Sequence, residues 1–388
     1  MLGFMDYIQH AFHLASQWNS DNSYSSLTAS ARDILDFDIP RGLRFSVSSL
    51  SSPNFANSYT FGTSGVVDGS LSYLYSSLPL QVASRSKHID LTELIRGYRH
   101  VLELRRPDNP WWWETWHRGK RVDRLATLLY GRLYVPASRL EALYLRRISP
   151  TRQVHLSCVS DERLQNGGTI LALLQDDRAK SSTEYLFSTD SALLGVRGLY
   201  NFGPDPRSST FPPNLLSRFS VGGELYYGLL NASGGCSTGL RFTTLPAHAG
   251  FPYTMTLTLN PLMGNLSSTY SVKAGRNLSM CSRFDFNFYS YESDFVVGWE
   301  VWRRRARPME SASDRLAEDV LSKPVPTLRD KEDDVEGVLK ARIDQNWRIG
   351  LLWEGRIKEL LVTLGASIDL RNRDQIARSV GLEIQYSS

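Results

Sequence analysis

Few residues in this 388-residue chain have the type and spacing that catalysis requires. Ser84 and Lys87 match a Ser-x-x-Lys pattern, but the companion motifs that such catalytic sites use are missing. His10 and His13 lie one helical turn apart and could share a metal ion, yet no third ligand accompanies them, so surface histidines are the simpler interpretation. The glycine-rich run 233–239 lacks the lysine and the helix of a phosphate-binding loop and therefore predicts a hairpin turn.

The cysteines give no further chemistry. Cys158, Cys236 and Cys281 are widely separated and odd in number, which argues against a disulfide framework and against a Cys-x-x-Cys metal site. The charge is also unspecific, because 44 basic residues stand against 40 acidic ones, too balanced for a nucleic-acid binder. We therefore hypothesise a non-enzymatic protein with no catalytic residues, no metal site, no cofactor and no nucleic-acid partner.

The elements that would position any site are strands. From residue 42 to residue 386 the chain forms about twenty short segments in which apolar and polar residues alternate, separated by turn residues. The last of them, 379–386, places Val380, Leu382, Ile384 and Tyr386 opposite Ser379, Gly381, Glu383 and Gln385. The fold class predicted by this pattern is all-β, and helical periodicity after residue 42 is limited to stretches near 91–97 and 314–321.

Strand length favours a transmembrane β-barrel over soluble all-β folds. Many segments run for nine or more residues, which is enough to cross a bilayer when tilted, whereas sandwich strands are often shorter. We expect two parts: an N-terminal segment, residues 1–41, and a barrel over residues 42–386 that contains a long charged loop at 303–336. A soluble all-β binding protein remains the alternative, and alkaline carbonate extraction would separate the two.

The N-terminal segment carries a short amphipathic helix at about residues 2–18, since Phe4, Ile8, Phe12 and Ala15 recur at helical spacing. Residues 1–31 contain no Lys or Arg, so neither a secretory signal nor a mitochondrial presequence is expected there. The pattern fits a helix that occupies a barrel lumen as well as it fits an ordinary soluble helix.

Several blocks resemble one fungal family. They are Met1–Tyr7, Leu35–Pro40, Ser48–Phe55, Gly65–Tyr75, Ser290–Ser293 with Trp299, and the C-terminal segment. In these blocks the chain is similar to the mitochondrial distribution and morphology protein 10 family. The resemblance covers essentially the whole chain. It implies a β-barrel of the mitochondrial outer membrane, related to the voltage-dependent anion channel and the general import pore, with about nineteen strands and an N-terminal helix in or near the lumen.

The resemblance also implies a targeting signal in the last strand. Mitochondrial barrels end in a strand with a polar residue, a glycine two positions on, and hydrophobic residues spaced by two, and Ser379, Gly381, Ile384 and Tyr386 fit that pattern. Such a strand pairs transiently with an edge of the assembly machinery, which requires an unobstructed backbone. The same residues also form the strand that closes the barrel.

The partners implied by the resemblance are the tether subunits of the ER–mitochondria encounter structure, the subunits of the sorting and assembly machinery, and outer-membrane lipids. Exposed aromatic residues make efficient contacts, so Tyr73, Tyr75, Tyr226 and Tyr227 are the candidate partner-binding residues, with an ordinary aromatic girdle as the alternative. Tyr226 with Glu224 could instead face the lumen and form a charged constriction. The alternative function is a metabolite or ion pore like the anion channel.

Overall fold

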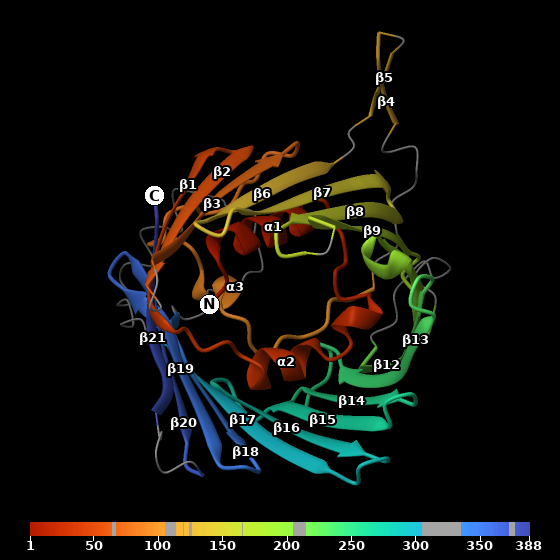
Figure 1. Cartoon of the computed structure of the whole chain (residues 1–388), viewed down its shortest axis with the longest axis vertical. Coiled ribbons are helices and arrows are strands. Elements are labelled where there is room, and N and C mark those ends of the chain that lie inside the picture. The colour runs from red at the N-terminus through yellow and green to blue at the C-terminus, as the bar shows by residue number, and fades with distance from the viewer. Residues whose placement is uncertain are drawn as a thin grey trace, which may run out of the picture.

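The computed structural model describes residues 1–63, 67–104, 114–118, 120–123, 126–164, 166–204, 215–304, 335–371 and 377–388. Nineteen strands form one closed sheet, which confirms the predicted barrel (Figure 1). They are β1 Gly42–Ser52, β2 Phe55–Thr63, β3 Val67–Ser76, β6 Thr127–Val135, β7 Arg139–Ser149, β8 Arg152–Ser160, β9 Gly168–Asp177, β10 Ser181–Ser188, β11 Leu193–Phe202, β12 Ser217–Gly228, β13 Ser233–Thr244, β14 Tyr253–Asn260, β15 Asn265–Lys273, β16 Leu278–Asn287, β17 Ser293–Arg304, β18 Val335–Asp344, β19 Arg348–Ile357, β20 Leu360–Asp369 and β21 Ala377–Ser387.

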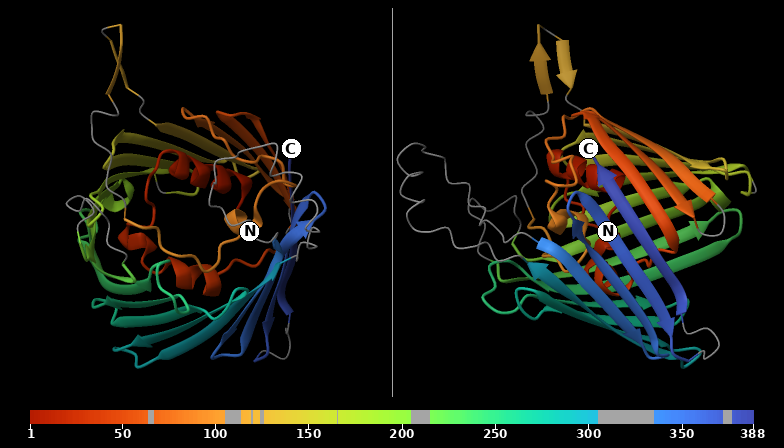
Figure 2. Two further views of the ribbon diagram at one scale, coloured as in Figure 1. Left: turned by 180° about the vertical axis from the view of Figure 1, so that it is seen from behind. Right: turned by 90° about the vertical axis from the view of Figure 1, so that its left-hand side faces the viewer.

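Consecutive strands of the barrel pair antiparallel, and β1 closes the sheet against β21 in parallel. An odd number of alternating strands leaves the first and last running in the same direction, so the parallel seam follows from the count. The register runs from Gly42 opposite Gly381 to Ser48 opposite Ser387. Figure 2 shows that the strands are tilted relative to the barrel axis, as closure of a sheet into a barrel requires.

The remaining elements are short. The helices are α1 Phe4–Ala15, η1 Tyr24–Ser26, α2 Ala29–Leu35, α3 Leu91–Leu94 and η3 Asp190–Ala192, and β4 Glu114–His117 and β5 Lys120–Asp123 form a separate two-stranded sheet. None of the helices in the described residues is both long and apolar enough to cross a membrane.

The helix predicted at about residues 2–18 is confirmed, because α1 lies within that range. Most of the loop expected at 303–336, residues 305–334, and the helical stretch near 314–321 lie outside the described residues.

The apolar core lies inside the barrel and is organised by the N-terminal segment. Phe4, Ile8 and Phe12 of α1 are buried in one cluster with Leu74 of β3 and with Leu91 and Leu94 of α3. The helix α2 packs against β15–β18, and η1 packs against β11 and β12. In Figure 1 these helices line the inside of the wall. The inside of the barrel therefore holds the N-terminal segment together with α3.

Candidate docking faces and the occupied lumen

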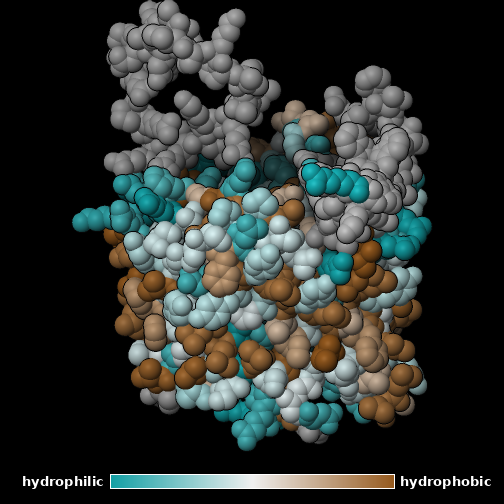
Figure 3. All heavy atoms as spheres, turned by 90° about the horizontal axis from the view of Figure 1, so that it is seen from above, coloured by the Kyte–Doolittle hydropathy of each residue, from teal (hydrophilic) through white to brown (hydrophobic). Residues whose placement is uncertain are grey.

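The outer face of the barrel is apolar and the inner face is polar. Many large hydrophobic side chains on the strands are exposed, while small polar ones such as Ser46, Ser58, Ser72 and Thr256 are buried on the lumen side. Figure 3 shows apolar residues in a belt around one face, with hydrophilic side chains gathered above it. This alternation suits a barrel whose outside contacts lipid.

Tyr73 and Tyr75 lie on the outer face of β3, 46% and 47% exposed. They belong to an aromatic patch, because the ring of Tyr73 stacks on Phe55 of β2 at 6.1 Å and meets Tyr59 edge-on at 6.4 Å. The hydroxyls of Tyr59 and Tyr73 are 3.4 Å apart. The patch therefore spans β2 and β3.

Tyr226 and Tyr227 do not form a pair. Tyr227 is 50% exposed on the outer face, but Tyr226 points into the lumen, where its hydroxyl donates to Glu224 Oε2 at 2.8 Å and accepts from Arg197. The expectation that both share an outward rim is wrong, because adjacent residues of a strand face opposite sides. The other expectation for Tyr226, a lumen position beside Glu224, is confirmed.

The lumen position of Tyr226 belongs to a chain of polar contacts that seats the N-terminal segment. Glu224 Oε1 accepts from Ser237 Oγ at 2.8 Å, and Ser237 Oγ lies 2.6 Å from the hydroxyl of Tyr24 in η1. Nearby, Asn22 Nδ2 donates to Asp177 Oδ1 at 2.6 Å. The contacts of Tyr24 and Asn22 join residues 213 and 155 positions apart and fix the path of the segment along the wall.

A row of glycines makes room for that path. A Cβ built on Gly222 would lie 2.6 Å from the ring of Tyr24, one on Gly298 would lie 2.7 Å from Leu35 Cδ2, and one on Gly365 would lie 2.8 Å from Pro40 Cδ. We call the following set the glycine track: Gly222, Gly239, Gly298, Gly350, Gly365 and Gly381. Residues 24–41 meet the track in the same order as the strands follow one another, so the segment is fitted to the wall along its length.

The signal residues of the last strand divide between the two faces of β21. Gly381 faces inward against the backbone of Pro40 and Arg41, where the N-terminal segment enters β1. Ser379 has the same parity as Gly381, whereas Ile384 and Tyr386 have the opposite parity and lie on the outer side of the seam. The close approach of Pro40 and Arg41 therefore explains why position 381 carries no side chain.

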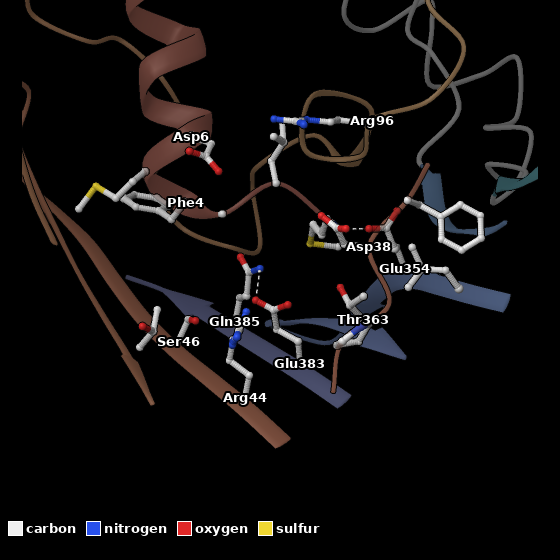
Figure 4. Close-up of a pocket in the computed structure, with 18 of the residues that line it drawn as sticks. Phe4, Asp6, Asp38, Arg44, Ser46, Arg96, Glu354, Thr363, Glu383 and Gln385 are labelled. Atoms are coloured by element: carbon white, nitrogen blue, oxygen red, sulfur yellow. Dashed lines mark hydrogen bonds and ion pairs between the residues drawn. The ribbon is translucent and has the colours of Figure 1, made fainter. Parts of the chain in front are cut away.

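Buried charged side chains lie where the N-terminal segment begins, near Met1. Glu300, Lys340 and Glu354 are 0%, 2% and 1% exposed. Lys340 Nζ lies 3.5 Å from Glu354 Oε2 and donates to the carbonyl of Arg96, and Glu354 also pairs with the amino group of Met1 (Figure 4). Glu300 Oε1 accepts from the backbone N–H of Tyr98 at 2.8 Å. The network ties the chain start and residues 96–98 to β17, β18 and β19.

Within the described ranges no group of three or more His, Cys, Asp or Glu side chains is placed to hold a metal ion. His13 on α1 does have two imidazoles near it, His10 and His155, and this proximity across the lumen has no signal in the sequence. Burial, together with these two neighbours, lowers the pKa of His13 to about 4.

The comparisons with known proteins agree with the geometry. The family model for mitochondrial distribution and morphology protein 10 matches residues 1–328 and 309–388. The chain is 64% identical to the protein of that name from Phaeosphaeria nodorum and 62% identical to the one from Sclerotinia sclerotiorum, with 100% of each chain covered in both cases. The Neurospora crassa protein of the same name is 41% identical, again over the whole of both chains. The chain belongs to the mitochondrial distribution and morphology protein 10 family.

Proposed function

We propose that this barrel is a non-enzymatic subunit of the mitochondrial outer membrane. It anchors the ER–mitochondria encounter structure, through which phospholipids are exchanged, and associates with the sorting and assembly machinery that inserts barrels. Mitochondrial shape and inheritance depend on it through these two complexes. The names of its relatives support a role in distribution and morphology, and the finer assignment follows from the family resemblance.

One observation favours a scaffold over a pore: the lumen holds the protein's own N-terminal segment. Helix α1, helix α2 and residues 95–101 contribute buried side chains there, and the glycine track fits the segment to the wall. With the inside occupied, the surface left for other proteins is the outer face and the two rims. The patch at Tyr73 and Tyr75 is the strongest candidate because it is aromatic and exposed.

Affinity isolation in mild detergent tests the proposal. The epitope belongs in the exposed turn 229–232, because the amino group of Met1 is buried against Glu354 and Ser387 bonds to Ser86 near the other end. We expect both the tether subunits and the barrel-assembly subunits to be recovered. Recovery of neither from a carbonate-resistant protein, together with conductance in planar bilayers, would support the pore instead.

A paired substitution tests the docking patch. Tyr73→Ala with Tyr75→Ala should leave the barrel resistant to carbonate extraction while reducing recovery of one partner complex, since both rings face outward. Tyr226→Phe is the matched control, because that ring lies in the lumen and the change keeps its volume. Loss of membrane insertion in the paired variant would show that the two rings serve the fold rather than a partner.

A further inference from the structure

A second cavity in the lumen has no role in the proposed docking function. Its volume is about 710 Å³, which is within the range of small-molecule sites. Its walls come from the polar side of α1, from α2, from residues 92–100 and from the ends of β15, β16 and β17. It adjoins the cavity drawn in Figure 4, of about 880 Å³, because Asp6, Arg32, Asp33 and Arg96 line both.

The two cavities differ in charge. The cavity of Figure 4 is lined by six Lys and Arg residues and seven Asp and Glu residues, which is close to balance. The second cavity is lined by six basic residues and only three acidic ones. Burial raises the pKa of two of those acids, Asp6 and Asp33, which favours their neutral forms and reduces the negative charge of the cavity further. The second cavity is therefore distinctly cationic.

Its cations have unused hydrogen-bonding capacity. In the part of the chain that the structure describes, the side chains of Arg32, Arg96 and Lys273 make no hydrogen bond or ion pair. Two further lining groups, Arg304 Nε and His100 Nδ1, are buried without a hydrogen-bond partner. Buried polar groups in folded proteins are normally satisfied, so Arg304 Nε and His100 Nδ1 lack an acceptor. Arg32 and Arg96 are exposed and Lys273 is half-buried, so their charged ends are accessible to a ligand in the cavity.

We propose that this cavity binds a small anion bearing phosphate. A single carboxylate would compensate only part of the positive charge, whereas a phosphate or pyrophosphate group brings two or more negative charges and several acceptor oxygens. Guanidinium groups suit phosphate because their planar donors contact two oxygens at once, and the lysine adds a point charge. The phosphate can belong to a soluble molecule or to a lipid headgroup, and the chemistry of recognition is the same.

Calorimetric titration of the full chain in detergent with pyrophosphate at low salt is the direct test. We expect saturable binding that weakens about tenfold or more in the double variant Arg96→Gln with Lys273→Gln, because two charge-assisted contacts are lost. Arg44→Gln is the matched control, since Arg44 is a lumen cation of the balanced cavity only. An equal loss in Arg44→Gln, or no binding by the unaltered protein, would overturn the assignment.

A measurement on the unaltered protein tests the proposal even if the variants fail to fold. Pyrophosphate should slow modification of Lys273 by an amine-reactive reagent while leaving Lys358, in the exposed turn after β19, unaffected. Unchanged modification of Lys273 at saturating pyrophosphate would contradict the proposal. Repeating the titration in phosphatidylcholine nanodiscs with and without phosphatidic acid distinguishes a lipid headgroup from a soluble ligand. Weaker pyrophosphate binding in the presence of phosphatidic acid assigns the site to a headgroup. Unchanged binding assigns it to a soluble ligand.

Discussion

Replacing Gly381 with alanine separates two explanations for the glycine of the last strand. A Cβ at this position would lie 2.8 Å from the backbone nitrogen of Arg41 and closer still to the carbonyl of Pro40. Neither atom can move as a side chain would, because Gly42, the next residue, already pairs with Gly381 across the seam. The substitution must therefore displace the start of β1 or weaken the parallel closure.

The expected cost is that of overpacking, at about 3 kcal/mol, the upper end for an added methyl group against backbone. For a urea m-value of about 3 kcal/mol per M, the unfolding midpoint of the refolded barrel in detergent falls by about 1 M. The control is Gly198→Ala on β11, an outward glycine whose added Cβ would have nothing within 4 Å. We expect that change to stay within about 0.5 kcal/mol of the unaltered protein.

Refolding in detergent, without any assembly machinery, is the informative assay. If Gly381 is required for packing against Pro40, Gly381→Ala is defective in the purified system as well as in isolated mitochondria. If it serves only recognition by the assembly machinery, the purified variant refolds and unfolds like the original, and assembly alone fails. That second result would refute the packing argument.

Three further perturbations follow from the lumen contacts. Glu354→Gln removes the carboxylate between Lys340 and the amino group of Met1 and should lower stability by about 3 kcal/mol or more in thermal unfolding, whereas Glu383→Gln, at a less buried carboxylate, should cost far less. The pKa of His13 is about 4 in the folded protein and about 6.5 in the unfolded chain, so below pH 6.5 the unfolded chain binds a proton that the folded protein does not. The free energy of unfolding therefore falls by up to about 3 kcal/mol between pH 6.5 and 4. His13→Gln should flatten that part of a stability-against-pH series. Phe12→Ala empties a fully buried site, so hydrogen exchange over residues 4–15 should accelerate while the strands stay protected; equal acceleration in the strands would contradict a locally seated helix.

The barrel could be predicted from sequence because strand alternation is a local signal. A period of two over nine or more residues identifies each wall segment, and the short turns separate the segments. The same rule puts Tyr226 on the polar face with Glu224 and Tyr227 on the apolar face with Leu225. Parity was sufficient there, and no long-range information was needed.

The contents of the lumen could not be predicted in the same way. The contact of Asn22 with Asp177, and the fit of Leu35 to Gly298, join residues that are far apart and carry no shared local pattern. A strand glycine reads in sequence as a weak point or a bulge. Only the closed barrel reveals that the six glycines of the track follow the path of residues 24–41.

The glycine track bears on how the barrel could serve two complexes with one outer face. Residues 24–41 fit against six of the nineteen strands through the glycine track, namely β12, β13, β17, β19, β20 and β21, and so support the wall from within up to the seam between β21 and β1. The aromatic patch at Tyr73 and Tyr75 lies on β3, outside the track but backed from within by Leu74, which packs in the core cluster of α1. If Tyr73 and Tyr75 dock partners as proposed, a face supported in this way would keep its shape whichever partner is bound, and exchange between complexes would require no rearrangement of the wall. Under that proposal the N-terminal segment contributes to docking indirectly, because α1 packs against the inner side of the strand that carries the two tyrosines.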